Sequence, residues 1–442
     1  MKKLSENNIS RYWMSGELPN LRDDSGNEVE VICAGRKSTR PGCDFQDAVL
    51  SVNTQKVTGD IEIHVTSDLW QKHGHHNNPA YNGIILHVVM WKQGELPVRS
   101  EAGGAVPTVV LSKYVTLREL EYHDKYLQVP GCKMLNRLAA NQIKNVLYAA
   151  GMERFKLKAD RFLLAIKSQA SEQVLYKGIC RALGYSRNAL SFERLSDCLP
   201  IGFILGNMKG NLTKKHAAII GSAGLLPSQR PPGKSCILDE TAQILEEEWR
   251  RMDVKTGNMN YTDWFFTPVR PGNHPVKRLA GLGYLINEYE NIGLLEGLLR
   301  LIKAAPSGRE AVNLEKGLLV EGNCYWTNHY DFGLYQRRGS AMIGGGRARE
   351  IAVNVILPFF FAYAQNASDK ILKYQILKLY KNYAGLPDNE LLRYMKSQLL
   401  SNGSEHLNAC EQQGLLHIYH SFCRAKDCFE CPVSICQTSG PV

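Results

Sequence analysis

The sequence predicts an α/β domain with a mixed sheet at the N-terminus, then a mainly α-helical domain and a C-terminal cysteine-rich metal lobe. Up to about residue 112, polar and apolar residues alternate with the period of two that is typical of half-buried strands. Beyond that point the apolar period becomes helical. The last twenty residues contain four cysteines, which indicates a metal site more than a packed core.

The N-terminal part begins with a predicted helix over residues 9–18 and a turn at Asp24-Ser25-Gly26. Strands are expected over residues 29–34, 48–53, 57–65, 84–91 and 106–111, where β-branched residues are frequent. The short connection at residues 53–56 predicts a hairpin. We place the first domain at residues 1–112 on this pattern.

The second part is expected to be helical, and its domain is placed at residues 113–405, before a lobe at residues 406–442. Residues 353–364 are apolar but interrupted by Asn354 and Pro358, and they are too few to cross a bilayer, so a buried helix is expected. The helical period predicts helices over residues 133–150, 158–181, 237–252, 276–303, 347–365 and 391–398.

The charge of the chain favours a polyanionic partner. Its 442 residues include 53 Lys and Arg against 43 Asp and Glu, a formal net charge of +10. Such an excess is typical of proteins that bind DNA or RNA, although other basic proteins share it. The first residues lack the apolar core of a signal peptide, so a cytoplasmic protein with no membrane partner is expected.

The first candidate site lies on the predicted strand 57–65 and the turn before it. Asp60, Glu62 and His64 alternate there with apolar residues, so the three polar side chains share one face. Asp44 follows Pro-Gly-Cys at an earlier turn. Carboxylates and an imidazole on rigid backbone could hold a divalent metal beside a proton-transfer group.

This order of residues resembles the PD-(D/E)xK nuclease superfamily, in which an acid before or on one strand is followed by acid-x-Lys on the next. The resemblance implies that Asp44 and Glu62 bind Mg²⁺ or Mn²⁺, with Asp60 as a possible further ligand. His64 stands where that superfamily has lysine, and it would orient or deprotonate the attacking water. Because imidazoles ligate transition metals, Mn²⁺ or Zn²⁺ fits better than Mg²⁺ alone. A first-helix glutamate, common in the superfamily, is not assigned to a residue.

A polar loop over residues 68–81 carries three further histidines. Loops set on a rigid strand framework are where catalytic residues concentrate. We therefore predict that His73 and His75 contact the metal or the scissile phosphate. His87, in the apolar strand that follows, is expected to be a hydrogen-bonded core histidine.

Longer motifs extend along nearly the whole chain. They are Gly-Asp-Ile-Glu-Ile-His at residues 59–64, Ala-Leu-Gly-Tyr at 182–185, Arg-Pro-Gly-Asn-His-Pro at 270–275 and Gln-Gln-Gly-Leu at 412–415. Together they resemble a bacterial family catalogued as domain of unknown function 2851. That resemblance implies no biochemical activity, so the expected function depends on the site residues and the nuclease likeness.

The C-terminal cysteines form a compact set with the pattern Cys-x4-Cys-x2-Cys-x4-Cys. Four thiolates at this spacing can hold one tetrahedral zinc ion or one 4Fe-4S cluster. The pattern resembles the iron–sulfur loop of endonuclease III-type DNA glycosylases, with shorter intervals. Zinc and iron–sulfur both stay open, and Cys410 or His420 could replace the last cysteine. The predicted ligands are Cys423, Cys428, Cys431 and Cys436.

A basic, glycine-rich stretch precedes the predicted helix 347–365. Free backbone amides at a helix start, with arginines beside them, can bind a phosphate backbone. A solvated basic loop would give the same pattern, and the Lys-Ser/Thr pair of a nucleotide-hydrolysing loop is missing. The predicted nucleic-acid-binding residues are Arg337, Arg338, Arg347 and Arg349.

The function expected from these features is that of a metal-dependent nuclease or phosphodiesterase acting on DNA or RNA. One alternative is a non-catalytic nucleic-acid-binding protein with a degenerate nuclease core, in which His64 marks lost activity. Another alternative is a metallohydrolase of small phosphoesters, which would need a closed pocket instead of an open basic groove.

Overall fold

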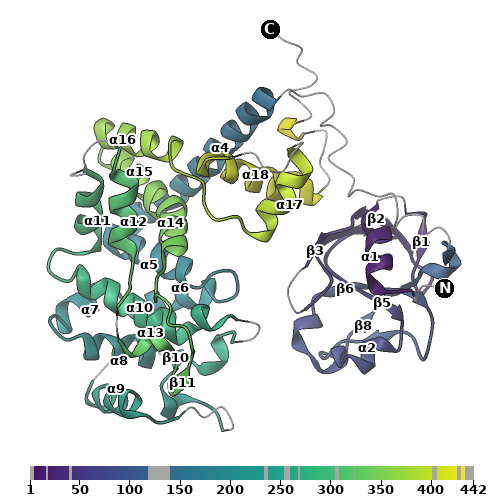
Figure 1. Ribbon diagram of the computed structural model, residues 1–442, viewed down its shortest axis with the longest axis horizontal. Coiled ribbons are helices and arrows are strands. Elements are labelled where there is room, and N and C mark those ends of the chain that lie inside the picture. Colours follow the sequence, from purple (N-terminus) through teal and green to yellow (C-terminus); the bar gives the residue numbers. More distant parts are fainter. Residues whose placement is uncertain are drawn as a thin grey trace. The chain divides into compact units, whose positions relative to one another are not determined.

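A computed structural model of the chain describes residues 4–15, 18–38, 42–117, 140–232, 237–252, 259–266, 269–303, 308–322, 324–400, 406–425 and 430–433. An N-terminal mixed sheet is followed by a mostly helical region, as predicted (Figure 1). The chain divides into two compact units. The first comprises Met1–Met152, Asp388–His406 and Glu411–Val442, and the second Glu153–Pro387 and Leu407–Cys410. The boundaries placed at residues 112 and 405 stay predictions.

The N-terminal sheet combines antiparallel and parallel pairs. Strands β2, β4 and β5 pair antiparallel, whereas β5, β6 and β9 pair parallel. The strands in spatial order are β1 (Leu21–Arg22), β2 (Glu28–Cys33), β4 (Phe45–Val52), β5 (Gln55–Thr66), β6 (Ile84–Trp91) and β9 (Thr108–Val110), with β3 (Arg36–Lys37) paired to β4. A separate hairpin contains β7 (Val98–Arg99) and β8 (Ala105–Val106).

The predicted hairpin at residues 53–56 joins β4 to β5. Asn53 and Thr54 form its turn with positive φ angles of 46° and 71°. Two consecutive residues with positive φ are typical of the tight hairpin turn that matches the strand twist. The Asn53 side chain also accepts a hydrogen bond from the Glu28 backbone N–H at 3.0 Å. The turn is therefore fixed to the neighbouring strand β2.

The connection from β5 to β6 is the feature that positions the site. Parallel neighbours cannot be joined by a tight turn, so the chain must cross over before it pairs again. This crossover contains α2 (Leu69–Lys72) and the 3₁₀ turns η1 (His75–Asn77) and η2 (Pro79–Tyr81). It returns the predicted histidine loop to the face of β5.

The two faces of the sheet have different roles. Helix α1 (Glu6–Ser15) lies across one face, where Trp13 packs with Ile61 and Ile63 of β5 in a fully buried core (Figure 1). Burying each such aliphatic side chain contributes about 1.5–3 kcal/mol. The opposite face packs against Trp70 and Tyr81 of the crossover. Polar residues of β5 therefore point toward the crossover, as the alternation predicts.

The helical region consists of one long helix, α4 (Ala140–Ser168), and many shorter ones. The shorter helices are α5 (Ser171–Leu183), α6 (Ala189–Cys198), α7 (Ile201–Asn207), α8 (Leu212–Ser222), α9 (Glu240–Arg251), α10 (Pro275–Glu288), α11 (Leu294–Lys303), α12 (Glu310–Leu318), α13 (Tyr325–Asn328), α14 (Gly345–Ile351), α15 (Leu357–Asn366), α16 (Lys370–Lys381), α17 (Glu390–Leu399) and α18 (Ala409–Ser421). A small hairpin of β10 (His329–Asp331) and β11 (Leu334–Tyr335) lies among them.

Two predicted helices are each interrupted. The predicted helix 158–181 is the end of α4 and the whole of α5, and the predicted helix 276–303 is α10 and α11. Gly293 adopts a φ of +83° between the latter pair, and the Glu172 carboxylate accepts the Leu294 N–H at 2.8 Å. The apolar period continues across such short breaks, so periodicity alone could not show them.

The apolar stretch 353–364 is a buried helix, as predicted. A π-helical turn over Ala352–Ile356 lies between α14 and α15, directly before Pro358. Because proline has no backbone N–H, a local change of hydrogen-bond register before it is expected. A membrane-spanning helix is absent from the described ranges, since no helix there combines the length and apolar composition that a bilayer requires.

Candidate metal centre

Four polar side chains from β5 and the crossover converge on one point. Nε2 of His64 lies 3.2 Å from Nδ1 of His73 and 3.3 Å from Nε2 of His75. The Glu62 Oε1 atom lies 3.2 Å from Nε2 of His75 and 3.6 Å from Nε2 of His64. Within the described part of the chain, His64, His73 and His75 are the one group of potential metal ligands whose donor atoms all lie within 4.8 Å of one another.

These separations match the edges of a metal coordination polyhedron. A zinc–nitrogen bond is about 2.0–2.1 Å long, so neighbouring ligand atoms around a tetrahedral zinc ion are about 3.3–3.4 Å apart. The four donor pairs given above are separated by 3.2–3.6 Å. Their spacing is therefore compatible with one bound cation of this size.

The crossover brings its two histidines together by a sharp turn. Gly74 adopts a left-handed φ of +76° between them, a conformation that glycine reaches without steric cost. Trp70 is fully buried and donates its indole N–H to the Arg99 carbonyl at 2.8 Å. The Tyr81 ring stacks on His75 with centroids 3.8 Å apart. Aromatic packing thus holds the loop against β5.

Burial favours the uncharged forms of His64 and His75. Desolvation, followed by the nearby His87, His75 and His73, lowers the pKa of His64 to about 2. Desolvation also lowers the pKa of His75. Each neutral ring retains a nitrogen lone pair that can bind a cation. Desolvation, followed by the negative charges of Asp44 and Glu6, raises the pKa of Glu62 to about 9.

Asp44 orients Glu62 from the neighbouring turn. The Asp44 backbone N–H donates to Glu62 Oε2 at 3.0 Å, and Asp44 Oδ2 accepts the Ile63 N–H at 2.9 Å. This reciprocal pair connects the turn to β5. The carboxylate of Asp44 lies beside the histidine group but is not part of it. Its predicted roles as ligand and catalytic residue stay predictions.

Asp60 lies on the same face of β5, two residues before Glu62. Asp60 Oδ1 accepts the Asp47 backbone N–H at 3.3 Å. The pKa of the Cys43 thiol is raised, first by burial and then by Asp60. Asp60 therefore contacts the turn around residue 43 and is not in the histidine group. Its predicted role as a metal ligand stays a prediction.

Glu6 is an acidic residue beside the site, and the sequence alone does not identify it as a site residue. It lies in the first turn of α1 and its pKa is raised, first by burial and then by Asp44. His73 and His75 act on it in the opposite direction, so Glu6 is close to all three residues. An acid at this place is also a common partner of the helix dipole, so its sequence position carries no signal of a site.

His87 is a buried, hydrogen-bonded histidine, as predicted. Its Nε2 atom lies 2.9 Å from Nδ1 of His64, and its Nδ1 atom lies 3.4 Å from Oγ1 of Thr108. Burial lowers the pKa of His87 to about 3, and His75 contributes further. His87 is therefore hydrogen-bonded to His64, which is one of the converging side chains. The sequence pattern does not reveal this contact.

The predicted cysteine site is described in part. Cys423 is half-buried in the 3₁₀ turn η9 (Cys423–Ala425), and Cys431 is buried. Cys428 and Cys436 lie outside the described residues. The four-thiolate site therefore stays a prediction.

The four predicted nucleic-acid-binding arginines differ in their surroundings. Arg347 pairs with Glu350 at 2.7 Å, and its guanidinium carbon lies 3.1 Å from the centroid of the Tyr185 ring. Arg349 pairs with Glu315 at 3.0 Å. Arg337, Arg338 and Arg349 are all exposed, whereas Arg347 is half-buried. Arg347 is therefore the least accessible to a partner, and the predicted role of all four stays a prediction.

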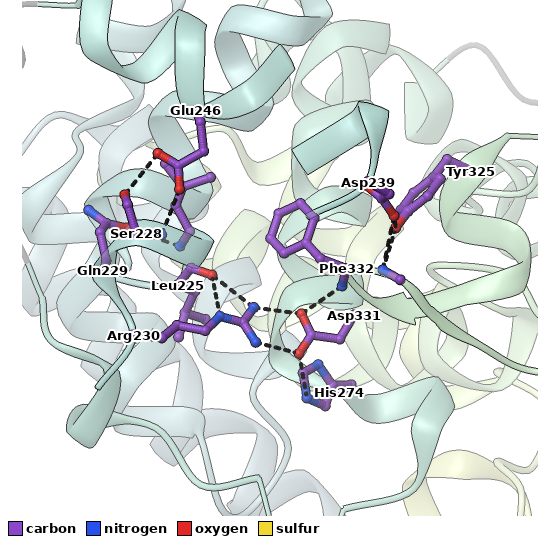
Figure 2. A network of polar contacts seen from close by, with 12 residues as sticks. Leu225, Ser228, Gln229, Arg230, Asp239, Glu246, His274, Tyr325, Asp331 and Phe332 are labelled. Carbon is purple, nitrogen blue, oxygen red and sulfur yellow. Dashed lines mark hydrogen bonds and ion pairs between the residues drawn. The ribbon is translucent and has the colours of Figure 1, made fainter. Parts of the chain in front are cut away.

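A second buried polar cluster lies in the helical unit, around Arg230 (Figure 2). Its guanidinium group donates to both carboxylate oxygens of Asp331, at 2.6 and 2.7 Å, and to the Leu225 carbonyl. Nε2 of His274 lies 3.9 Å from Asp331. Tyr325 donates its hydroxyl proton to Asp239 in the same region. The Arg230 and Asp331 side chains are only 4% and 6% exposed, so this pair is a buried salt bridge.

The chain matches one family model. The family described as "Protein of unknown function (DUF2851)" matches residues 8–388, which is more than half of the chain. No protein with a curated description and no solved structure matches the chain. The description of the family names no activity.

Proposed function

The chain belongs to the family described as "Protein of unknown function (DUF2851)", and from its own residues we propose that it is a metal-dependent phosphodiesterase acting on nucleic acid. The observation that carries this proposal is the convergence of imidazole nitrogens from His64, His73 and His75 within 4.8 Å, with Glu62 beside them. His64 and His75 are buried and His73 is exposed, so a cation bound among their nitrogens would be partly shielded from solvent and reachable from one side.

The donor set favours a transition metal ion. Three imidazoles suit Zn²⁺ and comparable ions, whereas Mg²⁺ prefers oxygen ligands. We therefore favour Zn²⁺ or Mn²⁺ over Mg²⁺. When bound, such an ion polarises a phosphoryl oxygen and lowers the pKa of its water. His64, His73 and His75 would hold it. Its positive charge would favour the ionised form of Glu62, which would accept the proton of the attacking water.

The proposed kinship with PD-(D/E)xK nucleases is supported by the order of acids along the chain. Glu6 lies on the first helix, Asp44 precedes β4, and Glu62-x-His64 lies on β5. Asp44 raises the pKa of both Glu6 and Glu62, and Glu6 also raises that of Glu62, so the three carboxyl groups are neighbours. His64 departs from the pattern of that superfamily, which has lysine at this position. In this chain His64 is part of the histidine group.

Nucleic acid is the proposed substrate because the chain carries a net charge of +10 and exposes Arg337 and Arg338. A phosphate backbone would be attracted by this excess of positive charge. A protein that binds nucleic acid without cleaving it would share these features, and the test must separate the two.

The test measures metal-dependent cleavage by the full chain. Metal-stripped protein is given Zn²⁺, Mn²⁺ or Mg²⁺ with labelled single- and double-stranded DNA and RNA, and with a small aryl phosphodiester. We expect cleavage of a nucleic acid with Zn²⁺ or Mn²⁺, and a loss of at least about 100-fold in Glu62→Gln and His73→Ala. His76→Asn is the matched control, because His76 lies in the same loop but outside the histidine group.

Three outcomes would change the proposal. Equal cleavage by the wild type and Glu62→Gln would contradict the catalytic assignment. Metal and nucleic-acid binding without cleavage would favour the non-catalytic alternative. Cleavage of the small ester alone would favour a metallohydrolase of small phosphoesters.

We also propose that Cys423, Cys428, Cys431 and Cys436 hold a second centre, either zinc or a 4Fe-4S cluster. Their close spacing supports this proposal. A broad visible absorption band from anaerobically purified protein, lost in Cys428→Ser, would select the cluster. Stoichiometric zinc without that band would select the ion, and neither metal in the protein would contradict a centre.

A further inference from the structure

A chain of hydrogen bonds lies behind His64, and its terminal acceptor favours one direction. It ends at the carbonyl oxygen of Val106, which can only accept a proton. Oγ1 of Thr108 lies 3.3 Å from that oxygen, so the Thr108 hydroxyl donates there. Its lone pair then faces Nδ1 of His87 at 3.4 Å, which favours the His87 tautomer with its proton on Nδ1.

The same logic fixes the tautomer of His64. With its proton on Nδ1, neutral His87 presents a lone pair at Nε2. Nδ1 of His64 lies 2.9 Å from this atom and must supply the proton of the hydrogen bond. Nε2 of His64 is therefore unprotonated, and it is the atom that faces His73 and His75.

With this tautomer, Nε2 of His64 carries a lone pair and no proton. That lone pair can accept an N–H from His73 at 3.2 Å or from His75 at 3.3 Å, or it can bind a metal ion. The connection to His87 therefore makes Nε2 of His64 available as a ligand. The lone pair of His64 then faces further nitrogens, an arrangement that a cation would stabilise.

We propose that His87 is a positioning residue. It accepts the Nδ1 proton of His64 and so leaves Nε2 of His64 as the atom that binds a metal ion, and Thr108 fixes the tautomer of His87. This inference rests on the proposed function, because it requires the metal. Histidine ligands commonly donate their second ring N–H to a fixed acceptor, which sets the tautomer and the ring orientation. Here the acceptor is itself a histidine.

The scaffold holds this chain rigidly. His64, His87 and Thr108 lie on the neighbouring strands β5, β6 and β9, and His87 is directly paired with Thr108 in the sheet register. The exposed fractions are 1% for His64 and 0% for both His87 and Thr108. Water therefore has little access to compete for these bonds, and their direction is set by the protein.

The test compares zinc affinity in the full chain, by competition with a chromophoric chelator, and the visible spectrum of the Co²⁺-loaded protein. We expect His87→Phe to weaken zinc binding by about 10–100-fold and to change the Co²⁺ spectrum. His87→Gln can still accept the His64 N–H and should restore most of the affinity. Thr108→Val, which keeps the side-chain shape, should give a smaller loss.

The outcomes separate this inference from the proposed function. Wild-type protein that binds no metal would overturn both. Equal zinc affinity in the wild type and His87→Phe would overturn the role of His87 and leave the metal site intact. If His87→Phe does not fold, nitrogen NMR of histidine-labelled wild type decides, because a metal-free His64 protonated on Nε2 would contradict the inference.

Discussion

Two buried polar clusters, one in each unit, differ in how donors and acceptors are matched. Around Arg230, each charged donor meets an acceptor, and the guanidinium group and Asp331 neutralise one another (Figure 2). Beside β5, His64, His75 and the carboxyl group of Glu62 lie close together, and none of these three groups carries a permanent positive charge. The matched cluster stabilises the fold by itself, whereas a bound cation would stabilise the unmatched one further.

The largest change in stability is expected when one partner of the buried Arg230–Asp331 pair is removed from the matched cluster. Asp331→Ala leaves the Arg230 guanidinium buried without its carboxylate and should lower the free energy of unfolding by about 3–5 kcal/mol. Urea denaturation measures this loss. The double variant Arg230→Met, Asp331→Leu removes both charges and should recover most of it. If Asp331→Ala were as stable as the wild type, the Arg230–Asp331 pair would not stabilise the fold.

The next effect concerns the unmatched cluster. Zinc at a free concentration of 100 times its dissociation constant should stabilise the wild type by about 2.7 kcal/mol. His73→Ala should lose this stabilisation, whereas Asp331→Ala should retain it, because only the former removes a donor of the histidine group. Thermal unfolding with zinc and with a chelator measures the shift. If zinc raised the unfolding temperature of His73→Ala as much as that of the wild type, His73 would not be a ligand and the contrast between the two clusters would fail.

A smaller effect depends on pH and lies in the matched cluster. His274 packs against Phe266 and Tyr330 and faces Asp331 and Arg230, and burial lowers its pKa to about 4. The unfolded chain binds a proton near pH 6.5, so the stability from this residue is complete above that pH and is lost as the pH falls toward 4.

The expected loss from His274 is about 2 kcal/mol at pH 5 relative to pH 7. Urea titrations at both pH values measure it, and His274→Gln should lack this part of the pH dependence. Identical pH profiles for the two proteins would show that His274 is not held uncharged by the cluster.

The smallest effect is expected for an exposed ion pair. Arg349 pairs with Glu315 at 3.0 Å, but its side chain is 44% exposed, and Glu315 also accepts the Tyr383 hydroxyl at 2.8 Å. Arg349→Ala should therefore change the free energy of unfolding by only about 0.5 kcal/mol. The urea midpoint provides the measurement. If Arg349→Ala lost as much free energy of unfolding as Asp331→Ala, burial would not explain the difference between the exposed and the buried ion pair.

Much of the sheet and part of the site could be predicted from the sequence. Strand alternation predicts that Glu62 and His64 share a face, and the predicted strand over residues 84–91 coincides with β6. The approach of His73 and His75 could only be a hypothesis, because it depends on the path of the crossover. Glu6 and the His64–His87 bond depend on tertiary packing, which periodicity does not encode.

The crossover has a consequence for folding. Glu62, His64, His73 and His75 all lie within residues 62–75, so the donors are close along the chain as well as in space. Contacts of short sequence separation form early, before distant strands such as β9 join the sheet. A cation could therefore find its ligands on a partly folded chain. The N-terminal unit would then be expected to refold faster when zinc is present from the start than when it is added afterwards.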